Sequence, residues 1–192
     1  MGVRRRVVLG TLAATGALVV GWSALPPRQR LVPSRPLAGR AGERAFNGWV
    51  RIGRDERVTV IVPKSEMGQG VHTALAMLLA EELDADLARA AVEQAPIDGI
   101  YNNLASVVDR LPFHPDDNGP LRSLAGWLTA KTMREFGLMM TGGSSSVKDL
   151  WLPLREAGAS ARAMLVAATA QRWSVPAGEI QVAAGRAAPP PP

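Results

Sequence analysis

Hydrophobic and polar positions follow strand and helix spacings in the first half of the chain. Apolar residues are concentrated in two short runs, 48–52 and 58–62, which are separated by the polar residues 53–56. This arrangement is typical of a β-hairpin, and the second run is apolar on both faces, as in a central strand. From residue 71 to residue 84, apolar side chains recur every three or four positions, which predicts a helix with one buried face.

Two more strands and a long helix are predicted further along the chain. Short apolar runs over 91–95 and 179–183 fit strands. The long helix lies between them and ends near residue 173. Either Ser146 caps this helix, with Pro153 kinking an early turn, or Pro153 is its first residue. Strands and helices in this order predict an α+β fold.

A further helix is predicted after a long irregular stretch over 97–119. Pro120 suits the first turn of this helix, and Gly137 suits its C-terminal end. Its expected buried stripe consists of Leu121, Leu124, Ala125, Leu128, Thr132 and Phe136.

The N-terminal segment is distinct from the rest of the chain. Residues 7–25 carry no charge and follow three arginines, and as a helix they would be about 28 Å long, enough to cross the hydrocarbon core of a membrane. We therefore expect a signal or transmembrane helix over 1–25, with membrane contact through residues 7–25. Residues 5–9, Arg-Arg-Val-Val-Leu, resemble a twin-arginine export signal, which predicts a location on the periplasmic side. A Pro/Arg-rich linker over 26–43 is expected to follow.

Charge and composition exclude several classes of function. The net charge is +5, but residues 1–40 contain seven arginines and no acid, whereas residues 41–192 contain 15 basic and 17 acidic residues. A nucleic-acid-binding domain concentrates positive charge on its folded body, so we expect no nucleic-acid partner. The chain has no cysteine, which excludes disulfides, thiolate metal sites and iron–sulfur ligation by this chain.

The first candidate site is a turn in which Gln69 stands between Gly68 and Gly70, where the predicted strand gives way to a helix. Glycines permit a tight turn and close approach of a ligand, and a helix N-terminus favours anionic groups. The carboxamide of Gln69 could donate to or accept from a polar cofactor. The spacing alone favours an ordinary tight turn with an exposed glutamine.

The second candidate site consists of Gly142, Gly143, Ser144, Ser145 and Ser146. Its backbone N–H groups and hydroxyls could hold a phosphate at the start of the long helix. It lacks the Gly-Lys-Ser/Thr ending of a nucleotide-binding P-loop. A plain serine cap with a flexible approach explains the same residues.

The two turns, in this order, resemble a known family. Residues 62–75 and 141–147 are similar to the large, molybdopterin-binding subunit of the xanthine dehydrogenase and aldehyde oxidase family. The branch most similar to this chain is the isoquinoline 1-oxidoreductase beta subunit, often described as a membrane-bound aldehyde dehydrogenase. The resemblance covers about 44–186 and implies a partial mixed α/β molybdopterin-binding domain, followed by a Pro-rich tail over 187–192. It extends through residues 80–83, 95–98, 101–103 and 154–159.

The resemblance implies roles for both turns. Gln69 would hydrogen-bond the molybdenum cofactor, which is molybdopterin, with its cytosine dinucleotide form as one option. Gly68 and Gly70 would shape that turn, and residues 142–146 would approach the pterin and its phosphate. The implied reaction is hydroxylation of an aldehyde or N-heterocycle with oxygen derived from water. Electrons would leave through iron–sulfur clusters on a separate small subunit.

The chain departs from this family in length. Family members are several times longer, and their catalytic glutamate lies far toward the C-terminus, so no catalytic residue and no direct metal ligand is assigned here. We expect an N-terminal portion of a molybdopterin-dependent oxidoreductase that is inactive by itself, truncated at the Pro-rich tail. The alternative is a non-catalytic, membrane-tethered binding or assembly module.

Overall fold

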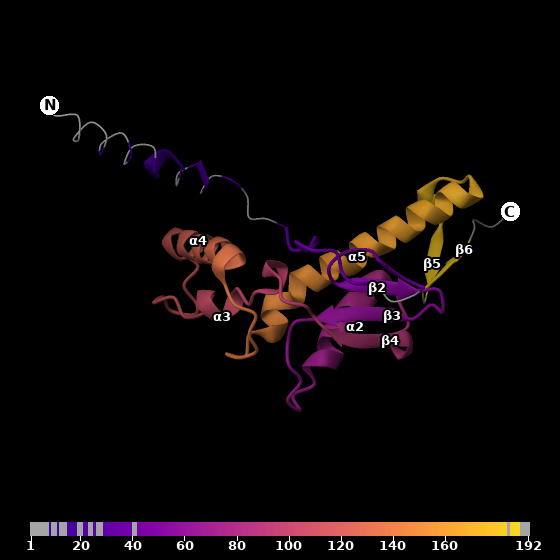
Figure 1. Ribbon diagram of the computed structural model, residues 1–192, viewed down its shortest axis with the longest axis horizontal. Helices are drawn as coiled ribbons and strands as arrows, with labels where there is room; N and C mark the ends of the chain where they lie inside the picture. Colours follow the sequence, from indigo (N-terminus) through magenta and orange to yellow (C-terminus); the bar gives the residue numbers. More distant parts are fainter. Residues whose placement is uncertain are drawn as a thin grey trace.

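The computed structural model describes residues 8, 11, 15–18, 21–22, 25, 29–39, 42–183 and 185–188. Within this part, a small sheet and two helices form the core, and a smaller helical region stands to one side of it (Figure 1). The mixed α/β architecture expected for the body of the chain is confirmed.

The sheet combines antiparallel and parallel pairing. It contains, in spatial order, β1 (Glu43–Ala45), β2 (Val50–Gly53), β3 (Val58–Val62) and β4 (Ala90–Gln94). The β1–β2 and β2–β3 pairs are antiparallel, whereas β3 and β4 are parallel. A parallel pair needs a crossover, which α2 (Val71–Leu83) supplies. The predicted hairpin, central strand, helix and third strand are confirmed, and β1 was not predicted.

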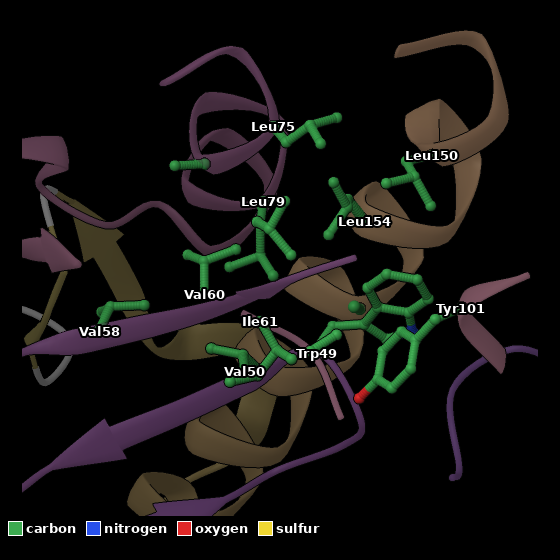
Figure 2. Packing of buried hydrophobic residues seen from close by; sticks show 14 of the residues in the cluster. Trp49, Val50, Val58, Val60, Ile61, Leu75, Leu79, Tyr101, Leu150 and Leu154 are labelled. Atoms are coloured by element: carbon green, nitrogen blue, oxygen red, sulfur yellow. The ribbon is translucent and has the colours of Figure 1, made fainter. Parts of the chain in front are cut away.

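The core lies where α2 and α5 (Ser146–Trp173) pack on each other and on the sheet. Leu75 and Leu79 of α2 and Leu154 of α5 are fully buried with Val60 of β3, as Figure 2 shows. Burial of each such side chain contributes about 1.5–3 kcal/mol. The two helices approach closely at Gly158, where an added Cβ would lie 2.4 Å from the carbonyl oxygen of Leu79.

The structure decides between the two predicted starts of the long helix, Ser146 and Pro153. The helix begins at Ser146, its N-cap is Ser145, and Pro153 lies inside it. Pro153 has no N–H to donate to the carbonyl of Asp149, four residues earlier, and that carbonyl instead accepts a hydrogen bond from the guanidinium of Arg30 at 3.1 Å.

The other face of the sheet carries buried charge. Arg51 of β2 forms ion pairs with Glu43 and Glu93 and donates a hydrogen bond to the carbonyl of Ala38. Residues 29–39, which were expected to belong to a linker, therefore contact the domain. The indole of Trp49 also donates to the carbonyl of Arg30.

The remaining elements connect these parts, and one of them, α4, stands apart from the sheet (Figure 1). They are η1 (Leu87–Arg89), η2 (Gly99–Tyr101), α3 (Ala105–Val108), α4 (Pro120–Phe136), η3 (Ala177–Glu179), and a hairpin of β5 (Gln181–Ala183) and β6 (Arg186–Ala188). The predicted bounds of α4 are confirmed, including its end before Gly137.

The predicted buried stripe of α4 is wrong. Leu121, Leu124 and Phe136 are 69%, 54% and 79% exposed, whereas Lys131 and Arg134 are buried. The ammonium of Lys131 donates to the carbonyls of Trp22 and Leu25, and the guanidinium of Arg134 donates to that of Gln29. Apolar spacing identifies one face of a helix, but it does not identify which face meets the rest of the chain. Here the buried face meets backbone carbonyls.

The expectation of a transmembrane helix is corrected by the structure. Among the described residues, no helix combines the length and the apolar character needed to span a bilayer. The longest of these helices, α4 and α5, carry charged side chains along their length. Much of the segment 7–25, on which that expectation rested, lies outside the described residues.

Candidate functional site

The first loop, Ser65–Gly70, connects β3 to α2 and is exposed throughout. Gly68 and Gly70 have φ angles of +92° and +74°, a left-handed conformation that glycine adopts without strain. A Cβ at either position would meet no atom within 4 Å. Both glycines are therefore required by backbone conformation, and the space beside them is open.

The N–H groups of the first loop are already paired with a carboxylate. Glu66 accepts hydrogen bonds from the N–H groups of Gly68 (2.9 Å), Gly70 (2.9 Å) and His72 (3.0 Å). These bonds, that from His72 foremost, hold the pKa of Glu66 below its ordinary value of 4.5. The start of α2 was expected to favour an anionic group, and this chain supplies that group itself.

Gln69 is fixed by its own loop. Its Nε2 donates to the carbonyl of Ser65 at 3.0 Å, and its Oε1 accepts from the N–H of Met67 at 2.5 Å. A carboxamide has two N–H donors, so one remains for a ligand. The side chain is therefore held in one orientation at an exposed position.

The second loop, Thr141–Ser145, precedes α5 and depends on the interior of the domain. Gly143 and Ser144 both have left-handed φ angles, +64° and +51°. Ser145 is fully buried, and its Oγ lies 2.8 Å from the carbonyl oxygen of Gly142. The same Oγ accepts from Nδ2 of Asn103 at 2.9 Å, and Asn103 also donates to the carbonyl of Met140.

The start of α5 has donors without acceptors. Among the described residues, the N–H groups of Ser146, Val147 and Lys148 meet no hydrogen-bond acceptor. Asp149, the acidic residue of the first turn, is turned inward and buried. These N–H groups at the positive end of α5 therefore have no counter-charge, whereas Glu66 supplies one at the start of α2.

The two loops lie side by side. The N–H of Ser65 donates to Oγ1 of Thr141 at 2.8 Å, across 76 positions of sequence. Lys64, which directly precedes the first loop, donates through Nζ to the carbonyl of Met140 (3.2 Å) and to Oδ2 of Asp149 (3.3 Å). The structure thus brings together two motifs that the sequence presented separately.

Beneath the loops lies a buried ion cluster formed by Arg30, Lys64 and Asp149, whose side chains are 10%, 0% and 1% exposed. Asp149 also accepts from the N–H groups of Leu104 (2.9 Å) and Ala105 (3.3 Å). Burial lowers the pKa of Lys64, and the neighbouring Asp149 opposes this shift.

Neither this cluster nor the role of Asn103 was predicted from the sequence. Charged side chains are rarely fully buried, so Lys64 and Asp149 resembled surface residues that flank two loops. Arg30 lies in the segment expected to be a linker. The one available signal was the position of Lys64, two residues after the apolar-rich run 58–62.

A cavity of about 430 Å³ lies elsewhere in the domain. It is lined from the beginning of β3, the end of α2, the middle of α5 and the β5–β6 hairpin, with Val58, Leu83 and Val182 among its residues. None of its lining residues belongs to either loop. The cavity is therefore separate from the surface that the two loops form.

Comparisons with known proteins agree with the resemblance seen in the sequence. Residues 17–108, which include the first loop, match the model of the molybdopterin cofactor-binding domain. The beta subunit of isoquinoline 1-oxidoreductase from Brevundimonas diminuta is 37% identical over 140 residues, covering 72% of this chain. The membrane-bound aldehyde dehydrogenase [pyrroloquinoline-quinone] from Gluconacetobacter polyoxogenes is 31% identical over 127 residues, covering 65% of this chain.

The chain spans only 14% and 12% of the lengths of these two relatives. The comparisons therefore concern one part of much larger proteins. The matched model and the two relatives together identify a molybdopterin-binding portion in this chain.

Proposed function

We propose that the two loops bind the molybdenum cofactor together, as part of an oxidoreductase of the aldehyde or isoquinoline type. The observation that carries this proposal is the hydrogen bond from Ser65 to Thr141, which places both loops on one surface. When bound, the cofactor would supply the redox chemistry, for which this chain contributes no cysteine.

The first loop fits a neutral, polar edge of the cofactor. Glu66 already accepts from the N–H groups of Gly68, Gly70 and His72, and a second negative charge beside that carboxylate would be repelled. The remaining N–H of Gln69 suits an oxygen or nitrogen acceptor. Gly68 and Gly70 leave room for that acceptor to approach the backbone.

The second loop fits the anionic part of the cofactor. The start of α5 combines the positive end of a helix with N–H groups that lack acceptors among the described residues. Gly142, Gly143, Ser144 and Ser146 would supply the contacts. Ser145 would act from below, because its hydroxyl is buried against Asn103.

The substrate and the partner are part of the same proposal. The reaction we propose is hydroxylation of an aldehyde or N-heterocycle, with electrons passing to a separate iron–sulfur subunit. The names of the two relatives, a subunit of isoquinoline 1-oxidoreductase and an aldehyde dehydrogenase, support this substrate class and the presence of a partner subunit. No residue of the two loops is placed as the catalytic base. The cytosine dinucleotide form of the cofactor would extend its anionic part beyond the second loop.

The test is binding of isolated molybdopterin to the full chain, measured by quenching of pterin fluorescence under anaerobic conditions. We expect Gln69→Ala to weaken binding about tenfold, the loss of roughly one hydrogen bond. Gln171→Ala, at an exposed position in the last turn of α5, is the matched control and should bind as the wild type does. Equal affinity of Gln69→Ala and the wild type would contradict the role of Gln69.

We also propose that the protein is exported by the twin-arginine pathway, on the basis of Arg5 and Arg6. Replacement of both by lysine should leave the chain in the cytoplasmic fraction, whereas replacement of Arg28 and Arg35 by lysine should not. Unchanged export of the Arg5→Lys/Arg6→Lys variant would overturn this proposal.

A further inference from the structure

The buried ion cluster of Arg30, Lys64 and Asp149 lies below both loops and has no role in the proposed binding contacts. Lys64 is the last residue before the first loop, and Asp149 lies in the first turn of α5, directly after the second loop. The cluster therefore joins the bases of the two loops.

We infer that Lys64 and Asp149 are positioning residues that set the spacing between the two loops, so that both reach one ligand. This inference rests on the proposed function of the loops. Its central observation is that Nζ of Lys64 contacts both ends of the second loop, through the Met140 carbonyl before it and the Asp149 carboxylate after it.

The hydrogen bonds to Asp149 fix the orientation of its carboxylate, and therefore the position at which Lys64 meets it. Its carboxylate is held by Arg30, by the N–H groups of Leu104 and Ala105, and by Lys64. A carboxylate with this many donors has one orientation. Lys64 meets it at 3.3 Å, so the end of β3 is fixed relative to the start of α5.

Stability alone does not explain a buried ion cluster at this place. Removing charged groups from water is energetically unfavourable, and well-packed apolar side chains often stabilise a fold equally well. What an apolar pair lacks is a fixed direction between the partners. The cluster also holds two cationic groups and one carboxylate, and this excess of positive charge below the second loop favours an anionic ligand above it.

The consequence appears at the contact between the loops. The bond from the Ser65 N–H to Oγ1 of Thr141 exists only while β3 and the second loop keep this spacing. Ser65 immediately follows Lys64, so any shift of Lys64 relative to Asp149 moves the donor away from its acceptor. The exchange rate of the Ser65 amide is therefore a direct measure of the spacing.

The experiment compares Lys64→Met with the wild type in the full chain. Methionine has a similar length and no charge, and Asp149 keeps Arg30 and two N–H donors as partners. We expect at least tenfold faster hydrogen exchange of the Ser65 amide, at least tenfold weaker molybdopterin binding, and unchanged exchange of core amides such as those of Val60 and Leu79. Unchanged Ser65 exchange with unchanged affinity overturns the inference.

A matched control removes an ion pair between α2 and α5, the two helices that follow the loops. Arg155→Met breaks the pair between Arg155 of α5 and Glu82 of α2, far along both helices from the loops. It should alter neither Ser65 exchange nor affinity. A loss as large as that of Lys64→Met would show that any weakening of the α2–α5 contact has this effect, which would also overturn the inference.

A milder variant covers the case in which Lys64→Met does not fold. Thr141→Val removes only the hydroxyl that accepts from Ser65, and Thr141→Ser restores it. We expect fast Ser65 exchange and weaker binding in Thr141→Val, and recovery of both in Thr141→Ser. Failure of the wild type to bind molybdopterin would refute the proposed function. The exchange results would still decide whether Lys64 fixes the spacing of the loops.

Discussion

The two loops are fixed in different ways. The first loop is closed by its own side chains, since Glu66 and Gln69 bond to backbone groups no more than six positions away. The second loop is fixed from a distance, since Asn103 and Lys64 reach it across 37 to 85 positions. The conformation of the first loop thus depends on a short stretch of sequence, whereas that of the second loop depends on the folded domain.

The two loops also differ in the kind of ligand group that they suit. The side chains of Glu66 and Gln69 accept from the N–H groups of Met67, Gly68, Gly70 and His72, and the first loop is left with an exposed carboxamide. The second loop has no such carboxylate, so the N–H groups that begin α5 are without acceptors among the described residues. A loop that carries its own counter-charge suits a neutral ligand edge, and a loop without one suits an anion.

The largest effect is expected from a change that disturbs both loops together. Helices α2 and α5 begin at the two loops, and Gly158 sets their separation. The Cβ of Gly158→Ala would lie 2.4 Å from the Leu79 carbonyl oxygen, so the helices must move apart, at a cost of about 3 kcal/mol. Urea unfolding measures this loss. Gly178→Ala, at an open position, should change stability far less.

Asn103→Ala should destabilise the second loop and leave the first loop unchanged. Its amide donates to Met140 and Ser145 and accepts from the N–H of Ser106, so truncation leaves buried partners unpaired at a cost of about 2 kcal/mol. Amides of the second loop should exchange faster, while those of the first loop keep their protection. Asn118→Ala, in an exposed turn, is the control. Equal loss of protection in both loops would show that they are not independent.

A smaller effect distinguishes two neighbouring glycines of the second loop. Gly143→Ala forces an alanine into a left-handed conformation, which costs about 1 kcal/mol. Gly142→Ala should be nearly neutral, because its Cβ would only touch Cε of Met140 at an ordinary 3.5 Å. Thermal unfolding of both variants measures the difference. Similar melting temperatures would contradict the left-handed conformation assigned to Gly143.

Features that depend on nearby residues could be predicted from the sequence, and features that depend on distant segments could not. The hairpin, α2, β4, the bounds of α4 and the two glycine turns depend on nearby residues, and local spacing predicted them. The role of Glu66 was missed although it is local, because a carboxylate beside glycines was not considered as their partner. The ion cluster, Asn103 and the buried face of α4 depend on segments far away in the chain. Local patterns carry no information about such partners.

The smallest effect tests the local character of the first loop through pH. The N–H groups of His72, Gly70 and Gly68 lower the pKa of Glu66 below 4.5, so its bonds are fully present above pH 4.5 and are lost as the pH falls through the folded-state pKa. Amide proton shifts of these three residues should follow that titration, with a midpoint below 4.5.

Glu66→Gln should remove this titration without affecting the second loop. Glutamine keeps the length of the side chain and one acceptor oxygen, but it no longer titrates and pairs more weakly with the N–H groups. The amides of the second loop should show the same shifts in Glu66→Gln and in the wild type across this pH range. A midpoint at or above 4.5, or a wild-type titration that persists in Glu66→Gln, would contradict a first loop closed by Glu66. A change in the second loop on replacement of Glu66 would show that the two loops are coupled through more than the contact between Ser65 and Thr141.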